Sequence, residues 1–237
     1  MVVFEGSAHV YDLIYEALGK DYAAEARDLD ALIQTRNPGA TSLLDVACGT
    51  GGHLARLHEH YQVTGVDLDP RMLDEARHKL PGVALVEADM RGFRLGLRFD
   101  AVICLFSSIG YMPTTSDLAA AITNMAAHLD PGGVLVVDGW VRPDAWRGPV
   151  STHVETATSD TLKVARCGVS RREANKTFLE IHHLVASAVG VEHLVNHHEL
   201  TLFTPHEYEA AFARAVLSVE TIASPLPDRD RYIGTKS

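Results

Sequence analysis

The sequence is poor in cysteine, and the few cysteines present do not form a recognisable set. Its 237 residues contain only Cys48, Cys104 and Cys167, and no two of them have CxxC spacing. An odd, scattered set of thiols argues against a disulfide framework. We therefore expect reduced cysteines and a cytoplasmic protein.

Long apolar runs are missing as well. No apolar segment reaches the ~18 residues that a membrane-spanning helix needs. Met1–Gly6 also lacks the basic flank and the apolar stretch of a signal peptide. We expect neither a leader nor a membrane partner.

Basic residues are scarce relative to acidic ones. The chain has 21 Lys and Arg against 31 Asp and Glu, which gives a net charge of −10. Because nucleic-acid binding depends on cationic side chains, this excess of acid argues against a nucleic-acid partner. Most of the negative charge lies before residue 140. The nearly neutral remainder is therefore the better place for an anionic small molecule.

The most informative segment of the sequence is a glycine-rich turn at residues 43–52, which read LLDVACGTGG. Strand, glycine turn and helix in succession present backbone N–H groups to a ligand. Leu54 stands where a dinucleotide-binding GxGxxG motif would have its third glycine, and the absence of GxxxxGKS/T excludes a P-loop. A turn without a ligand and a nucleoside-cofactor site both stay open at this point.

Two carboxylates follow the ends of the next two predicted strands. Asp67 ends the strand at 63–66, and a carboxylate there can accept hydrogen bonds from both hydroxyls of an adenosine ribose. Asp89 follows the strand at 83–86 and can accept a hydrogen bond from an adenine amino group, with Met90 packing on the ring. Together with the glycine turn, they predict a nucleoside site.

The apolar periodicity predicts alternating strands and helices through the first 140 residues. Helical spacing covers 7–36 (broken at Gly19), 53–60, 70–80 and 116–129, and strand patterns cover 43–46, 63–66, 83–86, 100–105 and 134–137. This alternation predicts an α/β fold with a doubly wound, mostly parallel sheet and helices on both faces.

Beyond Asp138 the pattern changes to that of an antiparallel meander. Strand-like stretches cover 152–166, 177–188 and 193–203, with turn-like breaks at 170–175 and 189–190. A helix at 205–213 and strands at 217–222 and 232–235 follow. We predict three parts: a cofactor-binding core with N-terminal helices at 1–140, an inserted antiparallel β lid for substrate at 141–203, and closing core elements at 204–237.

The segment Asp45–Gly51, followed by Asp67, resembles the first two motifs of class I S-adenosylmethionine-dependent methyltransferases, a family with a Rossmann-like fold. The resemblance implies S-adenosylmethionine as cofactor and S-adenosylhomocysteine as product. This cofactor has no phosphate, so the glycine turn would approach its methionine part while Asp67 takes the ribose.

Further segments resemble a narrower family, the dTDP-amino-deoxysugar N,N-dimethyltransferases of the desosamine and mycaminose type. These segments are Tyr11–Leu13, Gly19–Tyr22, Asp89–Arg91, Phe106–Tyr111 and Thr201–Thr204. The resemblance implies a homodimeric N-methyltransferase of antibiotic sugar biosynthesis that methylates the amine of a dTDP-linked deoxyamino sugar.

The same resemblance implies site residues. Cofactor contacts fall on Tyr22, Ala47, Gly49, Gly51, Asp67, Leu68, Asp89, Met90 and Leu105. Substrate contacts fall on Tyr15, Tyr111, Trp146, Arg166, Ser170, Arg172 and Arg229. Apart from the resemblance, we expect His182 to face the ligand, and Tyr15 and Tyr111 to be the catalytic pair that holds the amine. The chain has DGWV at 138–141 and PDRD at 227–230 where the family has EPWW and SGRG, which leaves the exact sugar and its amine position open.

Arginine and histidine chemistry adds two expectations. Arg166, Arg171, Arg172 and Arg229 can each bind phosphate oxygens through two N–H groups, as a diphosphate requires. Neighbouring histidines such as His182 and His183 point to opposite faces of a strand, so we expect no metal site.

Other functions remain in competition with a sugar N-methyltransferase. Residues 105–108 lack the Asn/Asp-Pro-Pro-Tyr motif expected of nucleic-acid and amide N-methyltransferases. A glycine-type methyltransferase of small amines stays open. So do a nucleotide-sugar binding protein without turnover and a dinucleotide oxidoreductase.

Overall fold

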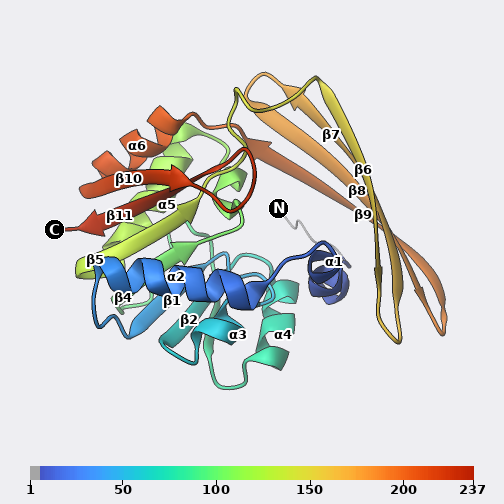
Figure 1. Cartoon of the computed structure of the whole chain (residues 1–237), viewed down its shortest axis with the longest axis horizontal. Coiled ribbons are helices and arrows are strands. Elements are labelled where there is room, and N and C mark those ends of the chain that lie inside the picture. The colour runs from blue at the N-terminus through green and yellow to red at the C-terminus, as the bar shows by residue number, and fades with distance from the viewer. Residues whose placement is uncertain (1–5) are drawn as a thin grey trace.

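A seven-stranded sheet and a separate four-stranded sheet organise residues 6–237, the part of the chain described by this computed structural model (Figure 1). Met1–Glu5, on which the expectation of no leader mainly depends, lie outside the described residues. Among the helices of residues 6–237, none is long and apolar enough to cross a membrane.

The large sheet has the strand order β10-β11-β5-β4-β1-β2-β3. The parallel strands are β1 (Ser42–Val46), β2 (Gln62–Asp67), β3 (Ala84–Glu87), β4 (Phe99–Cys104) and β5 (Leu129–Asp138). At one edge β11 (Asp230–Lys236) pairs antiparallel with β5 and with β10 (Leu217–Ala223). The predicted mostly parallel sheet is confirmed. Its order reverses at β1, and in such sheets ligands bind beyond the carboxyl ends of the strands at the reversal.

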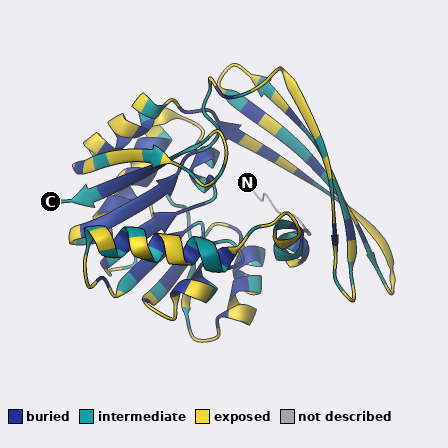
Figure 2. Cartoon of the chain, in the orientation of Figure 1, coloured by how far each residue is buried: buried dark blue, intermediate teal, exposed yellow. Residues whose placement is uncertain are grey.

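Helices cover both faces of the large sheet, and its central strands are almost wholly buried (Figure 2). One face packs against α2 (Tyr22–Arg36), α3 (Leu54–Leu57) and α4 (Pro70–Lys79), and the other against α5 (Thr115–Ala127) and α6 (Pro205–Arg214). The predicted start of α4 is confirmed, because the Asp69 side chain accepts a hydrogen bond from the Arg71 N–H and Pro70 stands at the first helical position.

Local differences from the predicted helices have simple causes. The expected helix at 53–60 is only one turn long, and turns follow it up to the buried Tyr61, whose hydroxyl donates to Asp30 at 2.7 Å. The region 7–36 is interrupted at Gly19, whose φ of 87° suits glycine. A short 3₁₀ helix, η2 (Ser108–Tyr111), follows β4 and was not predicted.

The small sheet is inserted between β5 and α6, as expected, but it has four strands where three stretches were predicted. They are β6 (Val150–Thr158), β7 (Lys163–Glu173), β8 (Lys176–Ser187) and β9 (Gly190–Thr201), in antiparallel order. The unpredicted turn lies at 159–162, where the Ser159 Oγ accepts a hydrogen bond from the Leu162 N–H. The predicted break at 170–175 is confined to Ala174 and Asn175, because β7 continues to Glu173.

Helix α1 (Tyr11–Ala17), which follows the 3₁₀ helix η1 (Ala8–Val10), lies between the two sheets (Figure 1). Val10 and Ile14 form an apolar cluster with residues of the small sheet, namely Ala157, Val164 and Val185. On the core side, Asp12 accepts a hydrogen bond from Thr50 Oγ1 at 2.7 Å and forms an ion pair with Lys79. The helix therefore connects the glycine turn to the small sheet.

Candidate functional site

A cavity of about 550 Å³ lies between the carboxyl ends of the core strands, α1 and one face of the small sheet. Its volume is in the range of small-molecule sites. Core residues from the glycine turn and the loops after β2, β3 and β4 line one side, and residues of β6 to β9 line the other. The site is thus formed where the sheet order reverses, as parallel α/β architecture leads one to expect.

The glycine turn and Asp67 form a cradle in the core wall. Gly49 donates its N–H to Asp67 Oδ2 at 2.7 Å, and Asp69 donates its N–H to Oδ1 at 2.9 Å. A Cβ built on Gly49 would meet no atom within 4 Å, so this position faces open space. Burial raises the pKa of Asp67, while the N–H groups of Asp69 and Gly49 oppose that rise. The backbone amides fix the carboxylate, and each oxygen keeps a lone pair for a ribose hydroxyl.

Asp89 and Met90 lie at the rim of the same wall. The Asp89 carboxylate is held by the Arg91 guanidinium, with a shortest distance of 2.6 Å, and Arg91 also bonds Asp117 at 2.9 Å. These hydrogen bonds hold the pKa of Asp89 below its usual value. The ionised carboxylate is therefore fixed at the cavity, where it can accept a further hydrogen bond.

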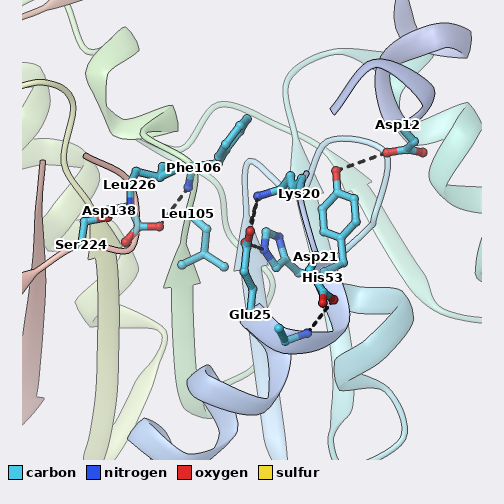
Figure 3. Close-up of polar contacts among 12 residues, drawn as sticks. Asp12, Lys20, Asp21, Glu25, His53, Leu105, Phe106, Asp138, Ser224 and Leu226 are labelled. Atoms are coloured by element: carbon cyan, nitrogen blue, oxygen red, sulfur yellow. Dashed lines mark hydrogen bonds and ion pairs between the residues drawn. The ribbon is translucent and has the colours of Figure 1, made fainter. Parts of the chain in front are cut away.

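The loop after β4 is strained where it lines the cavity. Phe106 and Ser107 have φ of 54° and 65°, a backbone conformation that residues other than glycine rarely adopt. Asp138 at the end of β5 accepts the Phe106 N–H at 3.2 Å (Figure 3), and Ser107 Oγ donates to the Gly139 carbonyl at 2.7 Å. The buried Arg231 guanidinium in turn bonds Asp138 at 2.7 Å. This network holds the Phe106 ring at the cavity wall.

Figure 3 also shows a polar network behind the glycine turn. Glu25 binds both Lys20, at 2.9 Å, and His53, at 2.7 Å. Burial would raise the pKa of Glu25, but hydrogen bonds from His53 and Lys20 outweigh it and lower that pKa to about 2. Tyr22 donates its hydroxyl to Asp12 at 3.3 Å and packs directly against the turn, since a Cβ on Gly52 would lie 2.5 Å from its ring. The predicted cofactor residue Tyr22 thus supports the turn from outside the cavity.

The two predicted catalytic tyrosines both line the cavity. Tyr15 packs edge-on against Phe106 at a centroid distance of 5.0 Å, and the Arg166 guanidinium lies 5.5 Å above its ring. The Tyr111 hydroxyl lies 2.7 Å from Nδ1 of His198, which is buried on β9. Burial raises the pKa of Tyr111 far above its ordinary value, so the hydroxyl keeps its proton.

Two of the predicted arginines also face the cavity. Arg166 pairs with Glu155 at 3.2 Å on the small sheet. Arg229 stacks on Trp140 at 4.6 Å, and its Nε atom is buried without a hydrogen-bond partner in the described part of the chain. Burial lowers the pKa of Arg229, yet a guanidinium remains charged at any physiological pH. Arg229 therefore brings a guanidinium with unused hydrogen-bonding capacity to the cavity wall.

The cavity brings together most of the predicted site residues. Those that line it are Tyr15, Ala47, Gly49, Asp67, Leu68, Asp89, Met90, Tyr111, Arg166 and Arg229. Gly51 and Leu105 lie beside it: Gly51 packs on Ala76 and Leu80 of α4 and its loop, and Leu105 is buried in the core.

The remaining predicted substrate residues are placed elsewhere. Trp146 bonds the Gly148 carbonyl within its own loop, and Arg172 bonds the Pro143 and Ala174 carbonyls. Ser170 is buried in β7 but does not line the cavity. His182 requires a correction, because it lies on the outer face of the small sheet, bonded to Glu180 and His193. Its neighbour His183 faces the cavity.

Several cavity residues were missed by reading the sequence. They are His153, His183 and His198 on the small sheet, and Phe106 and Trp140 in the core loops. The strand pairing Glu155↔Arg166↔His183 places all three side chains on one face. This pairing distinguishes His183 from His182, but it is known only once the register of the strands is known. Across residues 6–237, no group of three or more His, Cys, Asp or Glu side chains is arranged to hold a metal ion.

Comparison with known protein families and curated proteins gives two related findings. The model of a methyltransferase domain matches residues 43–133, which include the glycine turn, Asp67 and Asp89. A dTDP-3-amino-3,4,6-trideoxy-alpha-D-glucopyranose N,N-dimethyltransferase of Streptomyces venezuelae is 47% identical over 230 residues, covering 96% of each chain. The similarity therefore includes the small sheet as well as the core.

Solved structures agree with this result. The crystal structure of Streptomyces venezuelae DesVI matches with a TM-score of 0.92 at 44% identity, over 97% of this chain and 98% of that one. The structure of CalS10 with S-adenosylmethionine bound, an amino pentose methyltransferase from Micromonospora echinaspora involved in calicheamicin biosynthesis, matches with a TM-score of 0.86 at 38% identity, over 96% and 97% of the two chains.

Proposed function

Because the chain belongs to the S-adenosylmethionine-dependent methyltransferases of the dTDP-amino-sugar N,N-dimethyltransferase type, we propose that it dimethylates the amine of a dTDP-linked deoxyamino sugar in antibiotic sugar biosynthesis. The observation that carries this proposal is the joint cavity. It combines a nucleoside cradle at Gly49 and Asp67, a tyrosine pair, and two cations suited to a diphosphate.

The core wall has the residues that S-adenosylmethionine requires. Gly49 provides open space beside its backbone, Asp67 offers carboxylate oxygens for the ribose, and Asp89 with Met90 suits the adenine. When bound, this cofactor supplies a sulfonium methyl group that an amine lone pair attacks in line, while the electron pair of the broken C–S bond passes to sulfur. Tyr22, behind the turn, keeps the cradle in shape.

The work of the protein in this reaction is mainly orientation. Tyr15 and Tyr111, which both line the cavity, hold the amine and its neighbouring hydroxyl. Good alignment of two reactants lowers the activation free energy by roughly 7–11 kcal/mol. The amine enters as the neutral base, and its product ammonium returns a proton to water before the next transfer.

Arg166 and Arg229 are our candidates for the diphosphate. They approach the cavity from the small sheet and from the loop between β10 and β11, and Arg229 has an unsatisfied Nε. Guanidinium groups pair with phosphate oxygens through two parallel hydrogen bonds. We accordingly propose residues 141–203 as a substrate lid on the core, with the closing elements at 204–237 supplying Arg229.

We also propose that the protein is a cytoplasmic homodimer. Free cysteines at all three positions suit a reducing compartment. The outer face of the small sheet carries exposed apolar side chains, among them Val154 and Val191, which are 70% and 71% exposed, and exposed apolar side chains favour interfaces. Sedimentation of the Val154→Lys variant should give a monomer, whereas Leu97→Lys, at a 59% exposed leucine in the loop between β3 and β4, should leave the dimer intact. A monomeric wild type would contradict the proposal.

The decisive experiment is incubation of the purified protein with S-adenosylmethionine and a panel of dTDP-3-amino and dTDP-4-amino sugars. We expect a mass gain of two methyl groups on one of them, and no gain on glycine or other small amines. Calorimetry should show binding of S-adenosylhomocysteine and none of NAD. Methylation of glycine alone, or cofactor binding without transfer to any amine, would overturn the proposal.

A further inference from the structure

We infer that His198 is a positioning residue that directs the Tyr111 hydroxyl proton away from the substrate, so that the phenol oxygen acts as a hydrogen-bond acceptor for the amine. This inference deepens the proposed function and rests on it for the identity of the amine. Nothing in the sequence pattern pointed to His198, which follows His197 in an ordinary strand.

The two side chains come from different parts of the fold. Tyr111 stands on η2, next to the strained loop after β4, and His198 stands on β9 of the small sheet. Their hydroxyl and Nδ1 atoms are 2.7 Å apart, a short distance for a bond to a ring nitrogen. His198 is only 6% exposed, and both residues line the cavity. The pair therefore bridges the core and the lid at the place where the amine must lie.

The protonation states of the pair follow from its surroundings. Burial lowers the pKa of His198 to about 4, and the positive charge of Arg166 and the neighbouring His183 and His197 act in the same direction. Burial also raises the pKa of Tyr111. At neutral pH the pair is thus an uncharged phenol beside an uncharged imidazole. Neutrality allows either ring nitrogen of His198 to carry the proton, and we infer the tautomer protonated on Nε2, so that the phenol donates to Nδ1.

This assignment decides what Tyr111 offers to a ligand. With its only proton directed at Nδ1, the phenol oxygen presents lone pairs to the cavity and can accept an N–H bond. An amine that donates an N–H to Tyr111 keeps its own lone pair free to point elsewhere, as attack on a methyl group requires. If the proton instead pointed into the cavity, it would bond the amine lone pair and block the reaction.

The same geometry accounts for a stop after two transfers. A primary amine and its monomethylated product both carry an N–H that Tyr111 can accept. A neutral dimethylamine carries none, so it cannot be oriented in this way for a third transfer. Each transfer forms one N–C bond, breaks one C–S bond and leaves an ammonium that loses one proton to water. Tyr111 and His198 end each transfer with the same protons with which they began it.

A double-mutant cycle tests the inference. We expect His198→Leu to lower kcat for both methylations about tenfold, the loss that corresponds to one hydrogen bond, without changing the affinity for S-adenosylhomocysteine. The loss should disappear in a Tyr111→Phe background, and His198→Asn, whose Oδ1 can take the place of Nδ1, should restore most of the activity. His197→Leu, one residue away on the exposed face, is the matched control and should behave as wild type.

A second measurement does not depend on turnover. Nitrogen-15 spectra of histidine-labelled protein should show His198 with its proton on Nε2 and an unprotonated Nδ1, and Tyr111→Phe should change this signal. A proton on Nδ1, or an equal loss of activity from His198→Leu in the Tyr111→Phe background, would overturn the inference. If the wild type methylates no amino sugar, the proposed function fails, while the spectra still decide the state of the pair.

Discussion

The cofactor cradle leads to a quantitative prediction for the Asp67→Asn variant. In the wild type both carboxylate oxygens accept backbone N–H bonds, at 2.7 Å from Gly49 and 2.9 Å from Asp69. An amide keeps one oxygen but turns an NH₂ group toward the other N–H donor. A hydrogen bond to a charged group contributes about 1.5–3 kcal/mol, and a buried donor left unsatisfied costs about 1–3 kcal/mol.

We expect this free-energy loss to weaken cofactor binding, because the same carboxylate accepts hydrogen bonds from the loop and from the ribose. Taking about 3 kcal/mol for the combined loss, we expect the dissociation constant of S-adenosylhomocysteine to rise about 100-fold. Isothermal titration calorimetry measures this directly, with thermal unfolding as a check on the fold. Asp74→Asn is the control, because Asp74 is exposed on α4, away from the cavity, and pairs with Arg77. An affinity equal to wild type for Asp67→Asn would refute the assignment of Asp67 to the ribose.

Three further predictions concern the diphosphate site, the glycine turn and pH. Arg166→Ala and Arg229→Ala should each raise the KM for the nucleotide sugar about tenfold or more, through loss of charge-assisted hydrogen bonds, and an unchanged KM in both would refute their placement. Gly52→Ala should destabilise the protein by about 1–3 kcal/mol in urea unfolding, because the added carbon meets the Tyr22 ring, whereas Gly92→Ala, with open space, should not. The pKa of His198 is lowered to about 4 in the folded protein, so the unfolded chain binds more protons between that pH and about 6.5. The free energy of unfolding should therefore fall as pH drops through this window, and His198→Asn should reduce the fall; a pH dependence unchanged by the substitution would contradict this reasoning.

The core of the fold was accessible from the sequence because its signals are local. Each parallel strand is a short apolar run, and the residue that ends it, such as Asp67, reaches the sheet edge whatever the packing around it. The glycine turn has the same property. Its conformation is set by residues that tolerate positive φ, among them Gly49 and Gly51.

The small sheet was less accessible, since its side chains are assigned to faces by strand register. A shift of one residue moves every side chain to the opposite face. His182 and His183 are equivalent in the sequence, and only the pairing of Arg166 with His183 turns the second toward the cavity. Arg172, on β7, is placed outside the cavity for a related reason: its guanidinium donates to the Pro143 carbonyl, which the sequence does not reveal as a neighbour.

The position of α1 has a consequence for how the site comes into existence during folding. Its apolar residues pack against strands of the small sheet, more than 130 residues later in the chain, and its Asp12 binds the glycine turn from the other side. Closing so long a loop costs conformational entropy before the contact returns any stability. Because strands of the small sheet form one wall of the cavity, the complete substrate site exists only once these strands have paired and packed on α1.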